Sequence, residues 1–256
     1  MPLSYKEYID RRLEGKRKIH DVPAGLDLNG LLVEKLRPLW IGAGRLESGY
    51  LPQSAQRQEI ENPVYVCGLA RAGTTLLLEA IFRTGAFAAH SYRLYPFIDI
   101  PVVWERWTRL PAGAKTPPPQ ERGHLDLLDV TFDSPEAVEE MIWMYFFPRA
   151  HDPAVSNELD ATIRNPSFAA YYASHIRKIM HIFGKQRYLA KGNYNLTRIP
   201  YILSLFPDAR FVIPVRRAEA HIASLMKQHY LFTRLEQDDP RALRYMNRVG
   251  HFEFGL

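Results

Sequence analysis

The feature that most constrains the fold is an apolar run followed directly by a glycine-bearing loop and a helix-forming segment. Val64-Tyr65-Val66-Cys67 is β-branched and aromatic and stops at Gly68, as expected for a short buried strand. The loop ends at Gly73, and residues 74–82 are well suited to a helix. A strand that turns tightly into a helix is a building unit of a parallel α/β sheet.

Further strand and helix patterns alternate along the chain. Strands are predicted over 86–92, 188–190 and 209–215, and helices over 196–206 and 217–230. Ser134-Pro135-Glu136 and Asn165-Pro166-Ser167 each combine a capping residue with a proline in the first helical turn, so two more helices are predicted to begin there. The prediction is an α/β, P-loop-type three-layer fold with a central parallel sheet flanked by helices.

Residues 1–60 are predicted to form a helical N-terminal extension, with residues 61–256 as the α/β domain. Helices are expected over 5–14 and 28–40, and turns at Pro23-Ala24-Gly25, Gly42-Ala43-Gly44 and Leu51-Pro52. The Lys16-Arg17-Lys18 cluster is expected on a solvated face. Residues 250–256 carry no polar tail, so we expect the α/β domain to be truncated at its C-terminus.

The composition excludes several classes of protein. Of 256 residues, 46% are apolar and 24% charged, which is typical of a globular chain rather than a disordered one. A single cysteine, Cys67, can form neither an intramolecular disulfide nor a cysteine-rich zinc site. The net charge of +5 suits an anionic ligand, without a basic block for nucleic acid. With no transmembrane or signal-peptide pattern, we expect a cytoplasmic protein.

Residues 68–75 form a candidate phosphate loop. Gly68 and Gly73 have the spacing of the nucleotide-binding motif G-x-x-x-x-G-K-[ST], but Thr74 stands where the lysine should be. Backbone N–H groups at the start of the helix would still bind an anion, and Arg71 adds a charge within the loop. A triphosphate with magnesium is a poor fit without that lysine. The alternative is an ordinary strand-to-helix turn.

A second candidate anion site follows the 209–215 strand. Arg216 stands at the carboxyl end of that strand, where parallel sheets bind ligands. Ser224 lies eight residues further on, about two turns into the next helix. Together they would bind a second phosphate through a guanidinium fork and a hydroxyl. The alternative is a surface arginine and a serine with local hydrogen bonds.

Together, the two segments resemble the sulfotransferase superfamily in its bacterial and tyrosylprotein-sulfotransferase-like branch. The loop resembles the 5′-phosphosulfate loop of these enzymes, and the Arg216–Ser224 pair their 3′-phosphate motif. Lys191, in Ala190-Lys191-Gly192-Asn193, takes the place of their catalytic lysine. The resemblance covers residues 63–230. It departs from the family pattern at Ala70, where proline is common, and at Ala72, where serine is usual.

The resemblance implies the donor 3′-phosphoadenosine 5′-phosphosulfate and no metal. The residues implied to hold its 5′ end are Arg71, Ala72, Gly73, Thr74 and Thr75. Arg216 and Ser224 would hold the 3′-phosphate. Arg71 and Lys191 are the candidate catalytic cations, because charge builds on the leaving oxygen during sulfuryl transfer.

The general base is harder to assign. Tyrosylprotein sulfotransferases place a glutamate just after the second strand, where this chain has His90-Ser91-Tyr92-Arg93. His90 and His124 are the candidates because histidine titrates near neutrality, with Glu140 as a third. The aromatic residues near position 100 fit either an acceptor groove or the core: Tyr92, Tyr95, Phe97, Trp104 and Trp107.

The predicted function is therefore transfer of a sulfuryl group to an acceptor hydroxyl. A carbohydrate, a peptide, a lipid and a small molecule all remain open as the acceptor. One alternative is a non-catalytic module that binds a nucleotide or a sulfated glycan. The other is an ATP-dependent P-loop phosphotransferase, which the threonine at position 74 disfavours.

Overall fold

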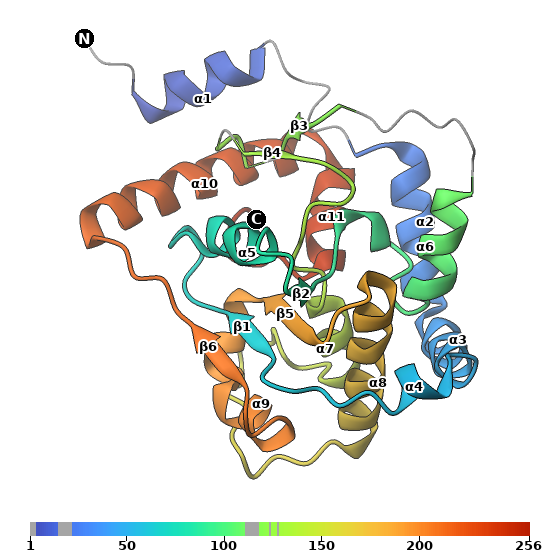
Figure 1. The fold of residues 1–256 in the computed structure, drawn as a ribbon. Coiled ribbons are helices and arrows are strands. Elements are labelled where there is room, and N and C mark those ends of the chain that lie inside the picture. The colour runs from blue at the N-terminus through green and yellow to red at the C-terminus, as the bar shows by residue number, and fades with distance from the viewer. Residues whose placement is uncertain (1–3, 15–21, 111–117, 123, 127) are drawn as a thin grey trace.

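The computed structural model describes residues 4–14, 22–110, 118–122, 124–126 and 128–256. At its centre lies a four-stranded sheet in the order β2-β5-β1-β6 (Figure 1). The strands are β1 (Val64–Val66), β2 (Phe87–Ala88), β5 (Arg187–Lys191) and β6 (Arg210–Val212). All three pairings are parallel. The predicted parallel sheet is therefore confirmed, although β2 and β6 are shorter than predicted.

Side chains alternate between the two faces of the sheet. On one face, Tyr65 and Tyr188 join the main hydrophobic core with residues of α8 (Pro166–Phe183). On the other face, Val64, Val66 and Leu189 cluster with Leu78 of α5 (Thr74–Phe82). Because helices cover both faces, both sets of alternate residues are buried, which is the usual condition of a parallel sheet. This arrangement confirms the predicted three-layer fold.

The remaining elements surround this sheet. The helices are η2 (Tyr92–Leu94), α6 (Pro101–Arg109), α7 (Glu140–Phe146), η3 (Asn193–Arg198), α9 (Ile199–Leu205), α10 (Ala218–Asp238) and α11 (Pro240–Val249). A small antiparallel hairpin pairs β3 (Gln120–Glu121) with β4 (Asp129–Val130). The predicted cap at Asn165 is present, since its side chain accepts a hydrogen bond from the Phe168 N–H.

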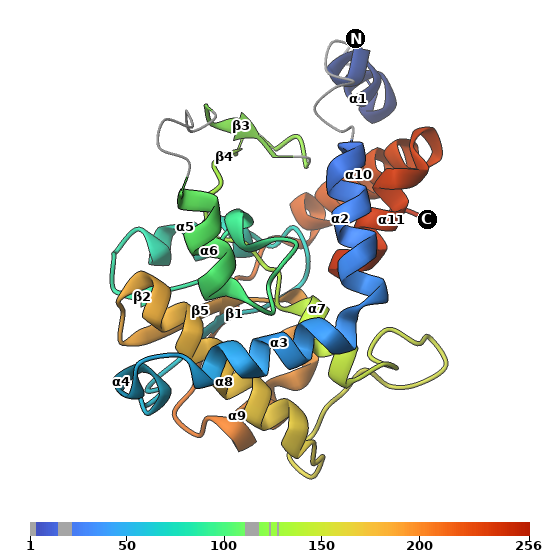
Figure 2. The ribbon, with the colours of Figure 1, turned by 90° about the vertical axis from the view of Figure 1, so that its right-hand side faces the viewer.

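The first 60 residues contain the helices α1 (Tyr5–Glu14), α2 (Ala24–Lys35), α3 (Arg37–Gly49) and α4 (Gln53–Gln56). Helix α2 packs against α11, whereas α3 and α4 pack against α8 (Figure 2). The predicted helical character of this segment is confirmed, and its boundary at residue 60 stays a prediction. Lys16-Arg17-Lys18 lies outside the described residues.

The turn predicted at Gly42-Ala43-Gly44 is wrong, because α3 runs straight through it. Gly44 allows α3 to approach the chain around Asp99 closely. A Cβ at position 44 would lie only 2.5 Å from the Asp99 carbonyl oxygen. The glycine therefore serves close packing rather than a turn.

The helix predicted to begin at Ser134-Pro135-Glu136 is also wrong. This segment is extended and forms a bridge between Pro135 and Ser91, and the Glu136 N–H donates to the His90 carbonyl at 2.9 Å. Helix α7 begins only at Glu140. Pairing with the chain after β2 satisfies the backbone groups that the helix would have used, and it leaves Glu136 on extended backbone.

Candidate active site

The phosphate loop lies at the carboxyl edge of the sheet and leads from β1 into α5. Its turn depends on left-handed backbone at Arg71 (φ 66°) and Gly73 (φ 108°), and the Ala72 N–H donates to the Leu69 carbonyl at 3.2 Å. The first N–H groups of a helix have no intrahelical carbonyl to bind. The start of α5 therefore presents the donors that suit an anion.

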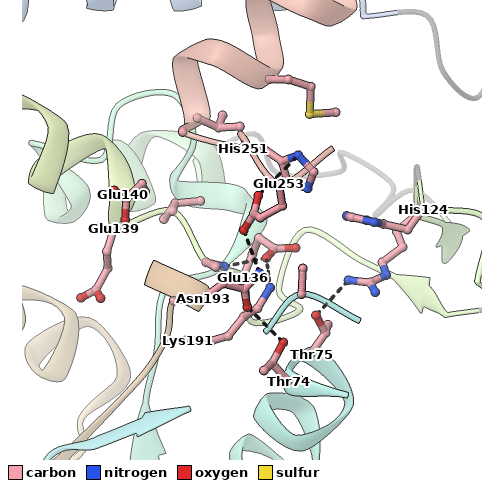
Figure 3. Close-up of a pocket in the computed structure, with 18 of the residues that line it drawn as sticks. Thr74, Thr75, His124, Glu136, Glu139, Glu140, Lys191, Asn193, His251 and Glu253 are labelled. Carbon is pink, nitrogen blue, oxygen red and sulfur yellow. Dashed lines mark hydrogen bonds and ion pairs between the residues drawn. The ribbon is translucent and has the colours of Figure 1, made fainter. Parts of the chain in front are cut away.

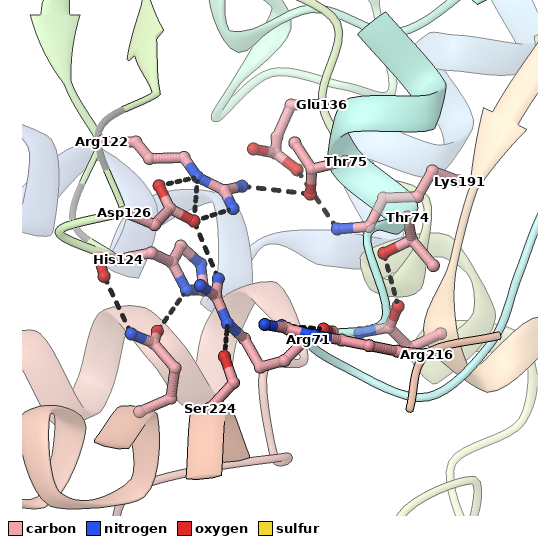
Figure 4. Close-up of polar contacts among 12 residues, drawn as sticks. Arg71, Thr74, Thr75, Arg122, His124, Asp126, Glu136, Lys191, Arg216 and Ser224 are labelled. Atoms are coloured by element: carbon pink, nitrogen blue, oxygen red, sulfur yellow. Dashed lines mark hydrogen bonds and ion pairs between the residues drawn. The ribbon is translucent and has the colours of Figure 1, made fainter. Parts of the chain in front are cut away.

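The start of α10 holds the phosphate loop in place. The His221 imidazole Nε2 lies 2.7 Å from the Ala70 carbonyl oxygen, and the Arg216 guanidinium donates to the Arg71 carbonyl at 3.2 Å. Arg71 in turn donates to Ser224 Oγ at 3.3 Å (Figure 4). The structure thus brings the two predicted anion sites together, and their ligand-binding roles stay predictions.

Arg122 and Asp126 complete a polar cluster that the sequence did not reveal. Asp126 accepts from Arg71 Nη1 at 2.8 Å and from Arg122 Nε at 3.0 Å and Nη2 at 2.5 Å. Arg122 Nη1 donates to Thr75 Oγ1 at 3.1 Å (Figure 4). Burial would raise the pKa of Asp126, but the two guanidinium groups hold it well below its usual range. The carboxylate therefore stays ionised.

Lys191 ends β5 beside Val66 of β1, and its Nζ lies 4.0 Å from Glu136 Oε1. Burial lowers the pKa of Lys191, although the Glu136 charge opposes this. Burial alone would raise the pKa of Glu136, but Lys191, the Ala137 N–H and the Tyr92 hydroxyl hold it below the ordinary value. The two side chains form a partly buried ion pair next to the phosphate loop (Figures 3 and 4).

A second connection joins the loop to the end of the chain. Thr74 Oγ1 donates to Asn193 Oδ1 at 3.4 Å, and Asn193 Nδ2 donates to Glu253 Oε1 at 2.8 Å (Figure 3). Asn193 opens η3, directly after Lys191-Gly192. The loop, the end of β5 and the segment after α11 are thus linked by side-chain hydrogen bonds.

Part of this network lines a cavity of about 460 Å³: Arg71, Thr74, Thr75, Arg122, Glu136, Lys191, Asn193 and Glu253 (Figure 3). Arg216 and Ser224 do not line it. Its cationic lining residues gather near the phosphate loop: Arg71, Arg122 and Lys191. Its carboxylates are Glu121, Glu136, Glu139, Glu140 and Glu253, and its larger apolar lining residues include Leu26, Tyr95, Trp143, Phe232, Tyr245 and Met246. A cavity with cations beside an apolar chamber can bind an anionic group next to a largely uncharged molecule.

The predicted bases fall in different places. His124 lines the cavity, and its Nδ1 lies 2.7 Å from Gln228 Oε1. Burial, with the Arg122 charge, places the pKa of His124 well below the usual range, so the imidazole is neutral. Glu140 also lines the cavity, but both of its carboxylate oxygens accept from the Arg198 guanidinium at 2.7 Å.

His90 is poorly placed for the role of base. It lies outside the cavity lining and is buried against His175 and Tyr188, at 2.7 and 3.1 Å from its two ring nitrogens. Burial lowers its pKa to about 3. The chain after β2 pairs with the segment around Pro135. That segment carries the carboxylate of Glu136, a residue that the sequence analysis assigned to a helix.

The aromatic residues divide between the two alternatives, a cavity wall and a packed cluster. Tyr92 and Tyr95 line the cavity. Phe97, Trp104 and Trp107 instead pack on one another, with ring centroids 4.4 and 4.9 Å apart, and take no part in the cavity wall.

No group of three or more His, Cys, Asp or Glu side chains in the described part of the chain has an arrangement that could hold a metal ion. Among the same residues, no helix combines the length and the hydropathy required to cross a bilayer.

The profile of a family described as "Sulfotransferase family" matches residues 63–250, a span that includes the phosphate loop, Lys191 and the Arg216–Ser224 pair. No curated protein matches the chain. The fold is similar to that of sulfotransferase STF1 from Mycobacterium tuberculosis H37Rv, with 16% identity and a TM-score of 0.43, over 97% of this chain and 72% of that one. On the strength of the profile match, this chain belongs to the sulfotransferase family.

Proposed function

We propose that this protein transfers a sulfuryl group from 3′-phosphoadenosine 5′-phosphosulfate to an acceptor hydroxyl. The observation that carries the proposal is the contact between the two predicted anion sites. Arg71 of the phosphate loop donates to Ser224, and Arg216 donates to the Arg71 main chain. A ligand with anionic groups at the 3′ and 5′ positions of one ribose would engage both sites at once.

The residues present fit such a donor. Arg71, Arg122 and Lys191 lie close to the phosphate loop, and the anions paired with them are Asp126 and Glu136. The loop is therefore a site of excess positive charge, which suits a phosphosulfate group. Residue 74 is threonine rather than lysine, which favours a donor that needs no magnesium-bound triphosphate.

Each residue has a separate role in the proposal. The donor would supply an electrophilic sulfur and an adenosine bisphosphate leaving group. The loop N–H groups of residues 73–75 and the Arg71 side chain would bind its 5′ end, with Arg216 and Ser224 on its 3′-phosphate. Lys191 would stabilise negative charge at the 5′ oxygen that leaves.

Glu136 is our candidate for the general base. It lines the cavity, and its lowered pKa keeps the carboxylate ionised and able to accept the proton of an acceptor hydroxyl. Its ion pair with Lys191 would place proton acceptance and charge stabilisation side by side. His124, which is neutral and lines the same cavity, is the second candidate.

The alternative of a binding module without catalysis rested on the missing glutamate after the second strand. A carboxylate beside Lys191 weakens that argument, because the site then holds a base and a cation together. The cavity's apolar residues favour an acceptor with an uncharged, partly apolar body. The five carboxylates that also line the cavity disfavour a polyanion.

Two measurements test the proposal. We expect adenosine 3′,5′-bisphosphate to raise the melting temperature at micromolar concentration without magnesium, because a ligand that binds only the folded state stabilises it. We then expect transfer of labelled sulfate from the donor to a member of an alcohol and phenol panel. A shift seen only with ATP and magnesium would overturn the proposal. Bisphosphate binding without transfer to any acceptor would favour the non-catalytic module.

A further inference from the structure

Arg122 is a cation at the phosphate loop that no motif predicts. We propose that it is a donor-binding residue, which contacts the 5′ anionic group of the donor together with the loop. The inference rests on the proposed function and adds to it a contact from outside the loop, from the chain that follows β3.

The first argument is position. Arg122 is separated from the loop by 47 residues, yet its Nη1 donates to Thr75 Oγ1 at 3.1 Å. Thr75 belongs to the first turn of α5, where an anion bound by the helix N–H groups would lie. Arg122 and Thr75 both line the cavity, so this guanidinium reaches the space that the anionic group would fill.

The second argument is orientation. Asp126 accepts from Nε and Nη2 of Arg122, at 3.0 and 2.5 Å. This is the fork geometry of an arginine–carboxylate pair, which fixes the plane of the guanidinium. With that edge fixed, the remaining Nη1 is the one directed at Thr75. The side chain is only 7% exposed, so its orientation is set before any ligand binds.

The third argument is charge. Arg71 and Arg122 both bind Asp126, so within this cluster two cations share one carboxylate. Arg198 provides a contrast within the same protein. It is equally buried, but its two Nη groups are matched by both oxygens of Glu140. The Arg71–Arg122 cluster therefore has a positive charge available to an anion, whereas the Arg198 pair is balanced.

The experiment compares two ligands on matched variants by isothermal titration calorimetry. The variants are Arg122→Gln, Arg122→Lys and the control Arg93→Gln. Arg93 makes a similar fork on Asp133, at 2.9 and 3.0 Å, but does not line the cavity. The ligands are adenosine 3′,5′-bisphosphate and adenosine 3′-monophosphate, which lacks the 5′ group.

We expect Arg122→Gln to weaken bisphosphate binding by about 10- to 100-fold, the range for a hydrogen bond between charged groups. Binding of the 3′-monophosphate should change by less than about twofold, because that ligand has nothing for Arg122 to contact. Arg122→Lys should recover part of the loss, since it keeps the charge and loses the fork. Arg93→Gln should bind both ligands like the wild type.

Two outcomes would overturn the inference. Unchanged bisphosphate binding in Arg122→Gln would remove the residue from the donor site. An equal loss of affinity for both ligands would show that Arg122 only supports the fold. If the wild-type protein binds neither ligand, the proposed function itself fails, which is a separate result.

Discussion

The Arg216 guanidinium donates a hydrogen bond to the main-chain carbonyl of Arg71, 3.2 Å away and 145 residues earlier in the chain. One of the two predicted anion sites therefore supports the backbone of the other. Because β6 lies directly beside β1, the loops that follow these two strands meet at the same edge of the sheet. This contact makes the pair testable as a single ligand site.

Arg216→Ala should weaken binding of adenosine 3′,5′-bisphosphate by roughly 1.5–3 kcal/mol, the range for hydrogen bonds to charged groups. The affinity for adenosine 5′-monophosphate, which lacks the 3′-phosphate, should fall much less. Calorimetric titration measures both. Arg217→Ala is the matched control, because Arg217 is the next residue, carries the same charge and is 90% exposed. An equal loss in both variants would contradict a specific role for Arg216.

Glu136→Gln should reduce kcat of sulfuryl transfer by about 10²- to 10⁴-fold, the usual contribution of a general base. Its affinity for the bisphosphate should stay close to that of the wild type, because the amide keeps the shape of the carboxylate. Steady-state kinetics and calorimetry together test this prediction. If His124→Gln gives the larger loss of kcat while Glu136→Gln keeps most of the activity, His124 is the base instead.

The pH dependence of kcat should be bell-shaped. The proposed mechanism requires an ionised Glu136 and a protonated Lys191. The pKa of Glu136 lies below its ordinary 4.5, so activity should fall only at acidic pH. The pKa of Lys191 lies below 10.5 because of burial, so activity should fall again before pH 10.5 as the ammonium group loses its proton. The acidic limb should disappear in Glu136→Gln, and its persistence there would argue against this assignment.

Glu139 should make folding stability depend on pH. Burial raises its pKa from 4.5 to about 7, so the folded protein holds this proton more tightly than the unfolded chain does. The resulting stabilisation is fully present below pH 4.5 and is lost as the pH rises to 7, a change on the order of 3 kcal/mol. Denaturant unfolding of wild type and Glu139→Gln across this range measures it. The difference in free energy of unfolding between the two proteins should not change with pH above pH 7. A difference that is the same at every pH would contradict the raised pKa.

Two glycines of α3 should respond in opposite directions to the same substitution. Gly42→Ala should raise the free energy of unfolding by about 0.5–1 kcal/mol, because alanine costs less backbone entropy within a helix and a Cβ there meets nothing within 4 Å. Gly44→Ala should lower it, because the added Cβ would lie 2.5 Å from the Asp99 carbonyl oxygen. Chemical denaturation tests the pair. Stabilisation by both would mean that α3 can move away from Asp99 at little cost.

Much of the fold could be predicted from contiguous sequence. The 64–75 segment specifies a strand, a loop with two glycines and a helix start, and α5 runs over 74–82 as predicted. Asn165-Pro166 likewise marks the true start of α8. These signals are reliable because capping, turn conformation and strand burial depend on residues only a few positions apart.

The prediction at Ser134-Pro135-Glu136 shows where local signals fail. A cap, a proline and an acidic residue favour a helix there, but backbone pairing between Pro135 and Ser91 satisfies the same groups in an extended form. The competing partner lies more than 40 residues away, so no local pattern contains it. As a result Glu136, the candidate base, was assigned to the wrong element.

At the site, Arg122 and Asp126 are a second example of residues that local signals do not reveal. Four residues apart after a proline-rich stretch, they give no pattern that separates them from an ordinary surface pair. From the sequence we could predict the phosphate loop and the Arg216–Ser224 pair as site candidates, because each lies beyond the carboxyl end of a strand. The family resemblance added Lys191. Only the tertiary structure brought Arg122 and Glu136 to that edge, because long-range contacts rather than local propensity fix the path of irregular chain.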